Sequence, residues 1–260
     1  MAHSILRTWR GALLAAVCLL AAPATRLVAQ RPAAPPPLPT GRQVVQRYVA
    51  AIGGESAFKR VTSIRLRGRF EITGQNITAE FEQVSARPDK LLMRAEITGV
   101  GHTEQGYDGK TAWSIDPQTG PRLLQDREKD ETQADADFDA PLHLPEHIKA
   151  LTTVAKTEFD GHPAYKVHVV LLSGVEQDEY FDTQSGLEVG WEARRKVPLG
   201  IVPTTAILRD YQKFGAILQP TSLVQKAMFI EQMLHITSVE YDVVPGNAFE
   251  LPAQIKALVK

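Results

Sequence analysis

Cysteine is nearly absent from this chain of 260 residues, and the single one, Cys18, lies in an apolar run near the amino terminus. If that run is removed, neither a disulfide framework nor a catalytic thiol remains. Stability must then come from a hydrophobic core. A chain of about 225 residues can supply one, because it buries roughly 70% of the surface that the unfolded chain exposes.

Signature motifs of catalysis and an excess of positive charge are missing as well. The chain contains no GxSxG nucleophile motif, no Walker-type phosphate loop and no dinucleotide fingerprint. Its 29 Lys and Arg residues are balanced by 30 Asp and Glu residues, so it lacks the basic excess that marks nucleic-acid binding. We therefore expect a protein that is not an enzyme, with no cofactor and no nucleic-acid partner.

The first 24 residues have the pattern of a secretory signal peptide. Arg7 and Arg10 precede the apolar run at 11–22, and the small residues at 22–24 offer a cleavage site. The run is shorter than the roughly 20 residues that span a bilayer. Two alternatives stay open, an uncleaved anchor and lipidation of Cys18. Residues 25–40 follow as a Pro-rich, extended linker.

Periodicity predicts an antiparallel sheet with helices at two places. Thr40 and Gln43 form a capping-box pair ahead of an apolar helical pattern, and residues 55–61 add a short second helix. Alternating strands begin at Ile64. The acidic segment 126–138 interrupts them as a helix, a further helix is expected at 145–152, and strands resume at Ala155. One domain over residues 41–260 is the simplest organisation.

The clearest hairpin spans residues 106–124. Asp108 and Gly109 form a turn dipeptide, after which Trp113 and Ile115 point to one face of a strand. A Trp at this place indicates a sheet that presents apolar surface. Some later strands carry apolar residues on both faces, as around Phe229, and such strands are either covered on both sides or line a cavity.

The acidic region contains a candidate calcium motif. Asp135, Asp137, Asp139 and Glu146 have the spacing of calcium-loop ligands. Ala140, however, stands where the sharp turn of such a loop requires glycine. We expect an acidic helix end instead of a metal site.

Two histidines form the second candidate metal motif. His143 and His147 are four residues apart, as on one helix face, but Pro145 lies between them and breaks a continuous helix. Solvent-facing histidines near a helix start are the better interpretation, and no metal is expected here either.

Five segments carry a resemblance to a known family: GRQVVQRYVAAIGGESAFKRVTSIRLRGRFEI (41–72), GYDGKTAW (106–113), YFDTQSGLEVG (180–190), DYQKFGAILQPTSL (210–223) and VEYDVVPGNAFELP (239–252). The chain resembles the LolA/LolB-like superfamily, most closely its secreted lipoprotein-sorting members. The resemblance implies an α+β fold in which an open, strongly curved antiparallel sheet, a half-barrel, is covered by an N-terminal helix and a central helical insertion. It also implies a periplasmic location.

The same resemblance implies a hydrophobic concavity that holds acyl chains of lipoproteins or other amphiphiles. Six apolar residues are candidates for its wall: Phe70, Ile72, Phe81, Leu92, Trp113 and Trp191. Plain core packing is the alternative for each of them. At the level of function, the alternatives to a carrier are an envelope sensing module with a protein partner and an unrecognised hydrolase of envelope lipids.

Overall fold

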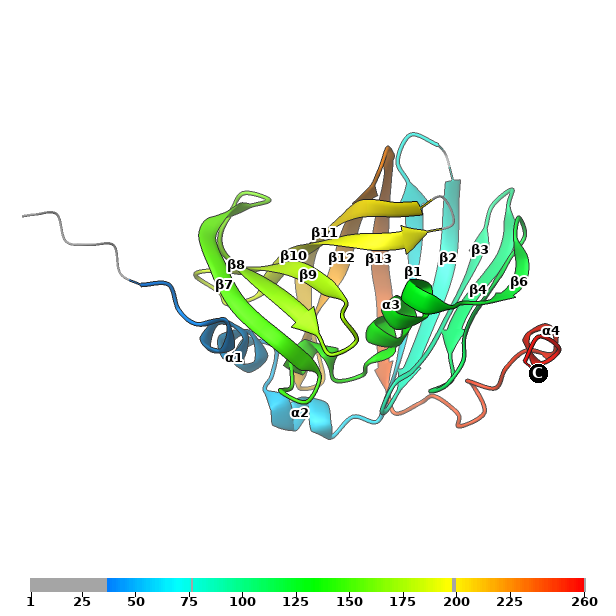
Figure 1. The fold of residues 1–260 in the computed structure, drawn as a ribbon, viewed down its shortest axis with the longest axis horizontal. Coiled ribbons are helices and arrows are strands. Elements are labelled where there is room, and N and C mark those ends of the chain that lie inside the picture. The colour runs from blue at the N-terminus through cyan, green and yellow to red at the C-terminus, as the bar shows by residue number, and fades with distance from the viewer. Residues whose placement is uncertain (1–36, 76, 198–199, 260) are drawn as a thin grey trace, which may run out of the picture. The chain divides into compact units, whose positions relative to one another are not determined.

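One antiparallel sheet of thirteen strands runs through the part of the chain that the computed structural model describes, residues 37–75, 77–197 and 200–259 (Figure 1). The strands are β1 (Ser63–Ile72), β2 (Ile77–Ala86), β3 (Lys90–Ile97), β4 (Gly101–Tyr107), β5 (Ala112–Asp116), β6 (Gly120–Leu123), β7 (Ile148–Phe159), β8 (His162–Leu171), β9 (Glu176–Asp182), β10 (Glu188–Val197), β11 (Gly200–Phe214), β12 (Ile217–Ala227) and β13 (Ile230–Tyr241). The helices are α1 (Gly41–Ala51), α2 (Glu55–Lys59), α3 (Asp126–Ala136), α4 (Ala253–Lys256) and a 3-10 turn (Ala140–Leu142). The predicted signal peptide with Cys18, and residues 25–36 of the predicted linker, lie outside the described residues.

The sheet consists of two meanders that meet through their first and last strands. Strands β1 to β6 follow one another in space, as do β7 to β13, and β1 pairs with β13 to give the order β6-β5-β4-β3-β2-β1-β13-β12-β11-β10-β9-β8-β7. Every neighbouring pair is antiparallel. The predicted antiparallel meander is therefore confirmed. Because β6 and β7 remain edges, the sheet is open.

The sheet curves strongly, as the contacts of one helix show. Helix α3 touches β3, β4 and β5 on one side and β10 on the other. Seven inter-strand steps separate β4 from β10 in the sheet order, which would be about 34 Å in a flat sheet. The 11-residue helix is only about 16 Å long, so the sheet must bend around it. This confirms the open half-barrel and the central helical insertion that covers it.

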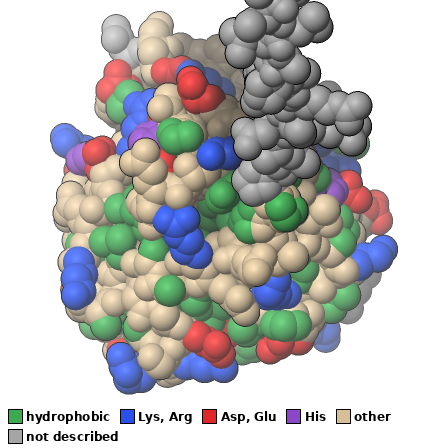
Figure 2. Space-filling view, turned by 90° about the vertical axis from the view of Figure 1, so that its left-hand side faces the viewer, with side chains coloured by type: hydrophobic (Ala, Val, Ile, Leu, Met, Phe, Trp, Pro, Cys, Tyr) green, Lys and Arg blue, Asp and Glu red, His purple; other side chains and the backbone are tan. Residues whose placement is uncertain are grey.

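The N-terminal helix covers the other end of the sheet. Thr40 and Gln43 form the predicted capping box, in which each side chain bonds the backbone of the other. The apolar face of α1 packs on β7 and β8, and its Tyr48 ring lies 5.3 Å from the ring of Phe181 on β9. Figure 2 shows the molecule from this side, with Lys and Arg side chains scattered over the visible face rather than gathered in one patch.

Two expectations about local structure are wrong. Residues 148–152 do not form a helix but begin strand β7, in which Leu151 pairs with Val169 of β8. The β-branched residues at 152–154 suit a strand, and the pairing overrides the weak helical pattern. Phe229 is not on a covered strand either. It lies in the turn between β12 and β13, where its side chain is 90% exposed.

Candidate functional site

A row of apolar side chains crosses the concave face of the sheet. Phe81 on β2 lies opposite Gly68 on β1 and Ala95 on β3. Phe70, on the same strand as Gly68, lies opposite Leu234 on β13. Residues two apart in a strand share a face, so these side chains point to the same side. The Phe81 ring covers Gly68 closely, since a Cβ atom at Gly68 would lie 2.8 Å from the ring.

This row is part of the floor of a groove with a volume of about 610 Å³. The volume lies in the range of about 300 to 1,000 Å³ that is typical of ligand pockets. Apolar side chains of strands β1, β2, β3, β12 and β13 face it, among them Phe70, Phe81, Leu91, Met93, Leu223 and Leu234. Met93 is 39% exposed although it is apolar, which identifies open hydrophobic surface.

Helix α3 covers this groove with polar side chains. Only three of its residues are buried, Glu131, Thr132 and Ala136, so the helix lacks the apolar stripe of an ordinary packed helix. Ala136 at its end packs into a small cluster that includes Leu91 and Tyr107. Elsewhere the helix is fixed by hydrogen bonds and ion pairs.

On one side these bonds reach the first meander. Arg122, just before the helix, donates two hydrogen bonds to Glu128, at 2.9 and 3.1 Å. The Gln105 side chain of β4 donates to the Thr132 hydroxyl at 3.2 Å. A charged, bidentate pair is stronger than a neutral hydrogen bond, so Arg122 holds this end of the cover.

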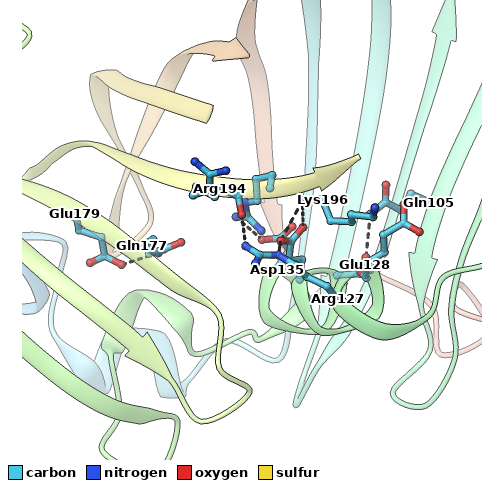
Figure 3. A network of polar contacts seen from close by, with 11 residues as sticks. Gln105, Arg127, Glu128, Asp135, Gln177, Glu179, Arg194 and Lys196 are labelled. Atoms are coloured by element: carbon cyan, nitrogen blue, oxygen red, sulfur yellow. Dashed lines mark hydrogen bonds and ion pairs between the residues drawn. The ribbon is translucent and has the colours of Figure 1, made fainter. Parts of the chain in front are cut away.

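On the other side the bonds reach β10. The backbone N–H of Lys196 donates to the Glu131 carboxylate at 2.9 Å, and Arg195 pairs with Asp135 at 3.0 Å. In Figure 3 the labelled residues of α3 lie beside Arg194 and Lys196 of this strand. Apart from the apolar contact of Ala136, the cover thus bridges two parts of the curved sheet through polar groups.

The position of Asp135 in the concavity changes the pKa of its carboxyl group. Burial raises the pKa of Asp135, and the nearby Arg195 guanidinium opposes this rise without cancelling it. The side chain is nevertheless 47% exposed, and it lines the groove. Arg195 also lies over the Trp191 ring, 5.2 Å from its centre, which fixes Trp191 at one end of the groove.

The structure divides the six predicted wall residues between the two faces of the sheet. Phe70, Phe81 and Trp191 line the groove, and Ile72 packs against the Phe70 and Phe81 cluster beside it. Leu92, by contrast, follows Leu91 on β3 and therefore points to the opposite face.

Trp113 lies on that opposite face with Leu92. It pairs with Gly106, and its ring lies so close to this glycine that a Cβ atom there would be 2.7 Å away. The C-terminal segment covers both side chains, with Phe249 and Ile255 packed against them. Trp113 is only 3% exposed and belongs to the core of this face.

The expectation of two solvent-facing histidines is wrong for His143. Its Nε2 lies 2.6 Å from a Glu179 carboxylate oxygen, and both side chains are buried. Burial lowers the pKa of His143, but the charge and hydrogen bond of Glu179 outweigh it, so the pKa ends above its ordinary value. His147 is more exposed and pairs with Asp137 at 2.6 Å. His143 caps the 3-10 helix Ala140–Leu142, and residues 145–147 form a turn instead of the expected helix start.

The carboxylates of the calcium-like motif have separate partners. Asp135 pairs with Arg195, Asp137 with His147, and Asp139 with Arg87. Among the described residues, no group of three or more His, Cys, Asp or Glu side chains is arranged to hold a metal ion. No helix in the described ranges is long and apolar enough to cross a membrane.

Comparison with solved structures identifies the fold. A DUF1329 family protein from Desulfovibrio piger matches with a TM-score of 0.55 and 13% identity, covering 80% of this chain and 96% of the other. A LolA superfamily protein from Nitrosomonas europaea matches with a TM-score of 0.53 and 9% identity, covering 82% and 99%. The fold is LolA-like.

A third structure with this LolA-like fold is a putative outer membrane lipoprotein-sorting protein domain from Vibrio parahaemolyticus. It has a TM-score of 0.51 and 10% identity, and the match covers 80% of this chain and 95% of the other. At such identities the similarity concerns the fold and not the ligand. No protein-family model and no curated protein matches the sequence.

Proposed function

We propose that this protein is a periplasmic carrier that binds acyl chains of lipoproteins or other amphiphiles in the groove, without catalysis. The observation that carries the proposal is the apolar floor of the groove beneath a polar, tethered helix. Phe70, Phe81 and Trp191 are the proposed contacts from the sequence-based set, with Ile72 beside them. A cover without an apolar stripe leaves the floor available to a ligand.

The energetics suit a carrier that both binds and releases. Burying a methylene group contributes about 0.8 kcal/mol, so roughly ten buried methylenes give about 8 kcal/mol before the cost of ordering the chain. The polar bonds of α3 can exchange with water when the helix moves. A ligand can then leave without the protein having to unpack an apolar helix.

Export is part of the same proposal. Residues 1–24 are proposed to direct the chain to the periplasm and to be removed there, with residues 25–40 as a linker ahead of the domain at 41–260. The mass of the protein purified from the periplasm tests this. Cleavage near Ala24 supports a soluble form, whereas a lipid-modified Cys18 would support an anchored one.

The decisive experiment identifies what the protein carries. Protein purified from cells without detergent is extracted with organic solvent, and the extract is analysed by mass spectrometry. A lipid or acylated peptide at about one equivalent supports the carrier. Repeated recovery of empty protein that also fails to bind added acyl chains would overturn it and favour a sensing or interaction module on this fold.

A further inference from the structure

A second, smaller cavity adjoins the groove. It has a volume of about 280 Å³ and lies between the end of α3, the segment after it and strands β8 to β10. Asp135, Trp191 and Arg195 line both cavities. The two spaces therefore meet at these three side chains, and a ligand that occupies one reaches the border of the other.

The lining of the smaller cavity differs from that of the groove. Hydrogen-bonding side chains converge on it, including Asp137, His143, Gln177 and Glu179, while Val169 and other aliphatic residues form its remaining wall. Figure 3 shows Gln177 and Glu179 joined by their hydrogen bond, which measures 2.7 Å. A polar space next to an apolar groove matches the two parts of an amphiphile.

The carboxylates that line this cavity favour some polar head groups of a ligand over others. Three carboxylates line it, those of Asp135, Asp137 and Glu179, each with one cationic or imidazole partner. His143 has a hydrogen-bond acceptor at each ring nitrogen, the Pro141 carbonyl and Glu179, so it donates from both and is charged. The lining thus offers three carboxylates against one guanidinium, that of Arg195, and two imidazoles, those of His143 and His147.

The same carboxylates retain capacity for a ligand. An ionised carboxylate can accept about four hydrogen bonds. Glu179 accepts from His143 and Gln177, and one bond from Arg195 reaches Asp135. The unused positions accept hydrogen bonds from O–H or N–H groups and repel anions.

We propose that the smaller cavity is the head-group site for the amphiphile whose acyl chain occupies the groove, and that it takes a hydrogen-bond-donating head, hydroxyl or ammonium, in preference to a phosphate. This inference rests on the proposed carrier function. It assigns Glu179 and Asp137 as head-group contacts and Trp191 as the boundary between head and chain.

Three probes with the same 12-carbon chain test the selectivity: 1-dodecanoylglycerol, dodecylamine and dodecyl phosphate. Each is titrated by calorimetry below its micelle concentration at pH 7. The glycerol and amine probes are expected to bind at least about tenfold more tightly than the phosphate, which corresponds to about 1.4 kcal/mol. Equal affinity of all three would overturn the head-group site while leaving the carrier intact.

Glu179→Gln tests the site directly, and Asp178→Asn is its matched control. Both residues are carboxylates of β9 that pair with a histidine, Glu179 with His143 and Asp178 with His168. Neighbours in a strand point to opposite faces, so Asp178 lies outside the cavity. Glu179→Gln should abolish the discrimination against phosphate, and Asp178→Asn should preserve it. Discrimination that survives in Glu179→Gln but is lost in Asp178→Asn would contradict the proposal.

A second variant covers the case in which Glu179→Gln does not fold. Ala134 of α3 lines the smaller cavity but not the groove. Ala134→Leu is compatible with a helix. It should weaken binding of the glycerol and amine probes, while their 12-carbon chains still contact the groove. If it weakens no probe, the head-group site is wrong. If no 12-carbon probe binds the unaltered protein, the carrier itself fails.

Discussion

The two faces of strands β2 to β5 are both apolar, yet they have different covers. On the convex side Val84, Leu92 and Trp113 are sealed by the C-terminal segment with Phe249 and Ile255. On the concave side the floor around Phe81 and Met93 is covered by the acidic helix α3, and about 610 Å³ remains open. The face that is covered by apolar side chains forms a core, whereas the face that is covered by a polar helix keeps an open groove.

The largest effect is expected on the sealed face. Trp113→Ala should lower the free energy of unfolding by about 3 to 5 kcal/mol, because it removes a buried ring and leaves a cavity. Urea unfolding measures the loss, and binding of a 12-carbon probe by the folded fraction should stay unchanged. A stable variant that no longer binds would instead move Trp113 to the ligand site.

The concave face should be the pH-sensitive one, because titratable groups hold it together. The pKa of His143 is raised above 6.5 in the folded protein, so the pair with Glu179 stabilises fully below about pH 6 and loses this contribution as the pH rises through the folded value. His143→Asn should therefore cost about 3 kcal/mol at pH 6 and clearly less at pH 9. Urea unfolding at both pH values checks this, and an equal cost at the two would contradict it.

Met93→Glu places a charge on the open floor without emptying a core. Since Met93 is already 39% exposed, the free energy of unfolding should change by less than about 1 kcal/mol. Affinity for a 12-carbon probe should fall at least about tenfold, because the chain would bury a carboxylate. Arg94→Glu, on the other face of the same strand, is the control and should bind as before. Unchanged binding by Met93→Glu would place the ligand elsewhere.

The comparison of the two faces of the sheet also shows how much of the structure the sequence could predict. Alternation and turn residues were enough for the meander and for the helix at α3, because both depend on local patterns. The face of each strand was not predictable, since Leu91 and Leu92 look alike until the pairing with β2 is known. The resemblance implied a central helical cover, but not which strands this helix bridges. Helix α3 has no apolar stripe, so only its partners, such as Lys196 sixty-five residues away from Glu131, show where it lies.

The smallest effect is expected from loosening the polar cover itself. Glu131→Gln weakens the bonds to Arg127 and to the Lys196 N–H, at a cost of about 1 kcal/mol. Because the groove floor is unchanged, a 12-carbon probe should bind with similar affinity but exchange faster, which stopped-flow tryptophan fluorescence can measure. Asp130→Asn removes the same charge from α3 and leaves the Glu131 bonds in place, so its exchange rate should match the unaltered protein. Equal rates in both variants would mean that α3 does not control entry to the groove.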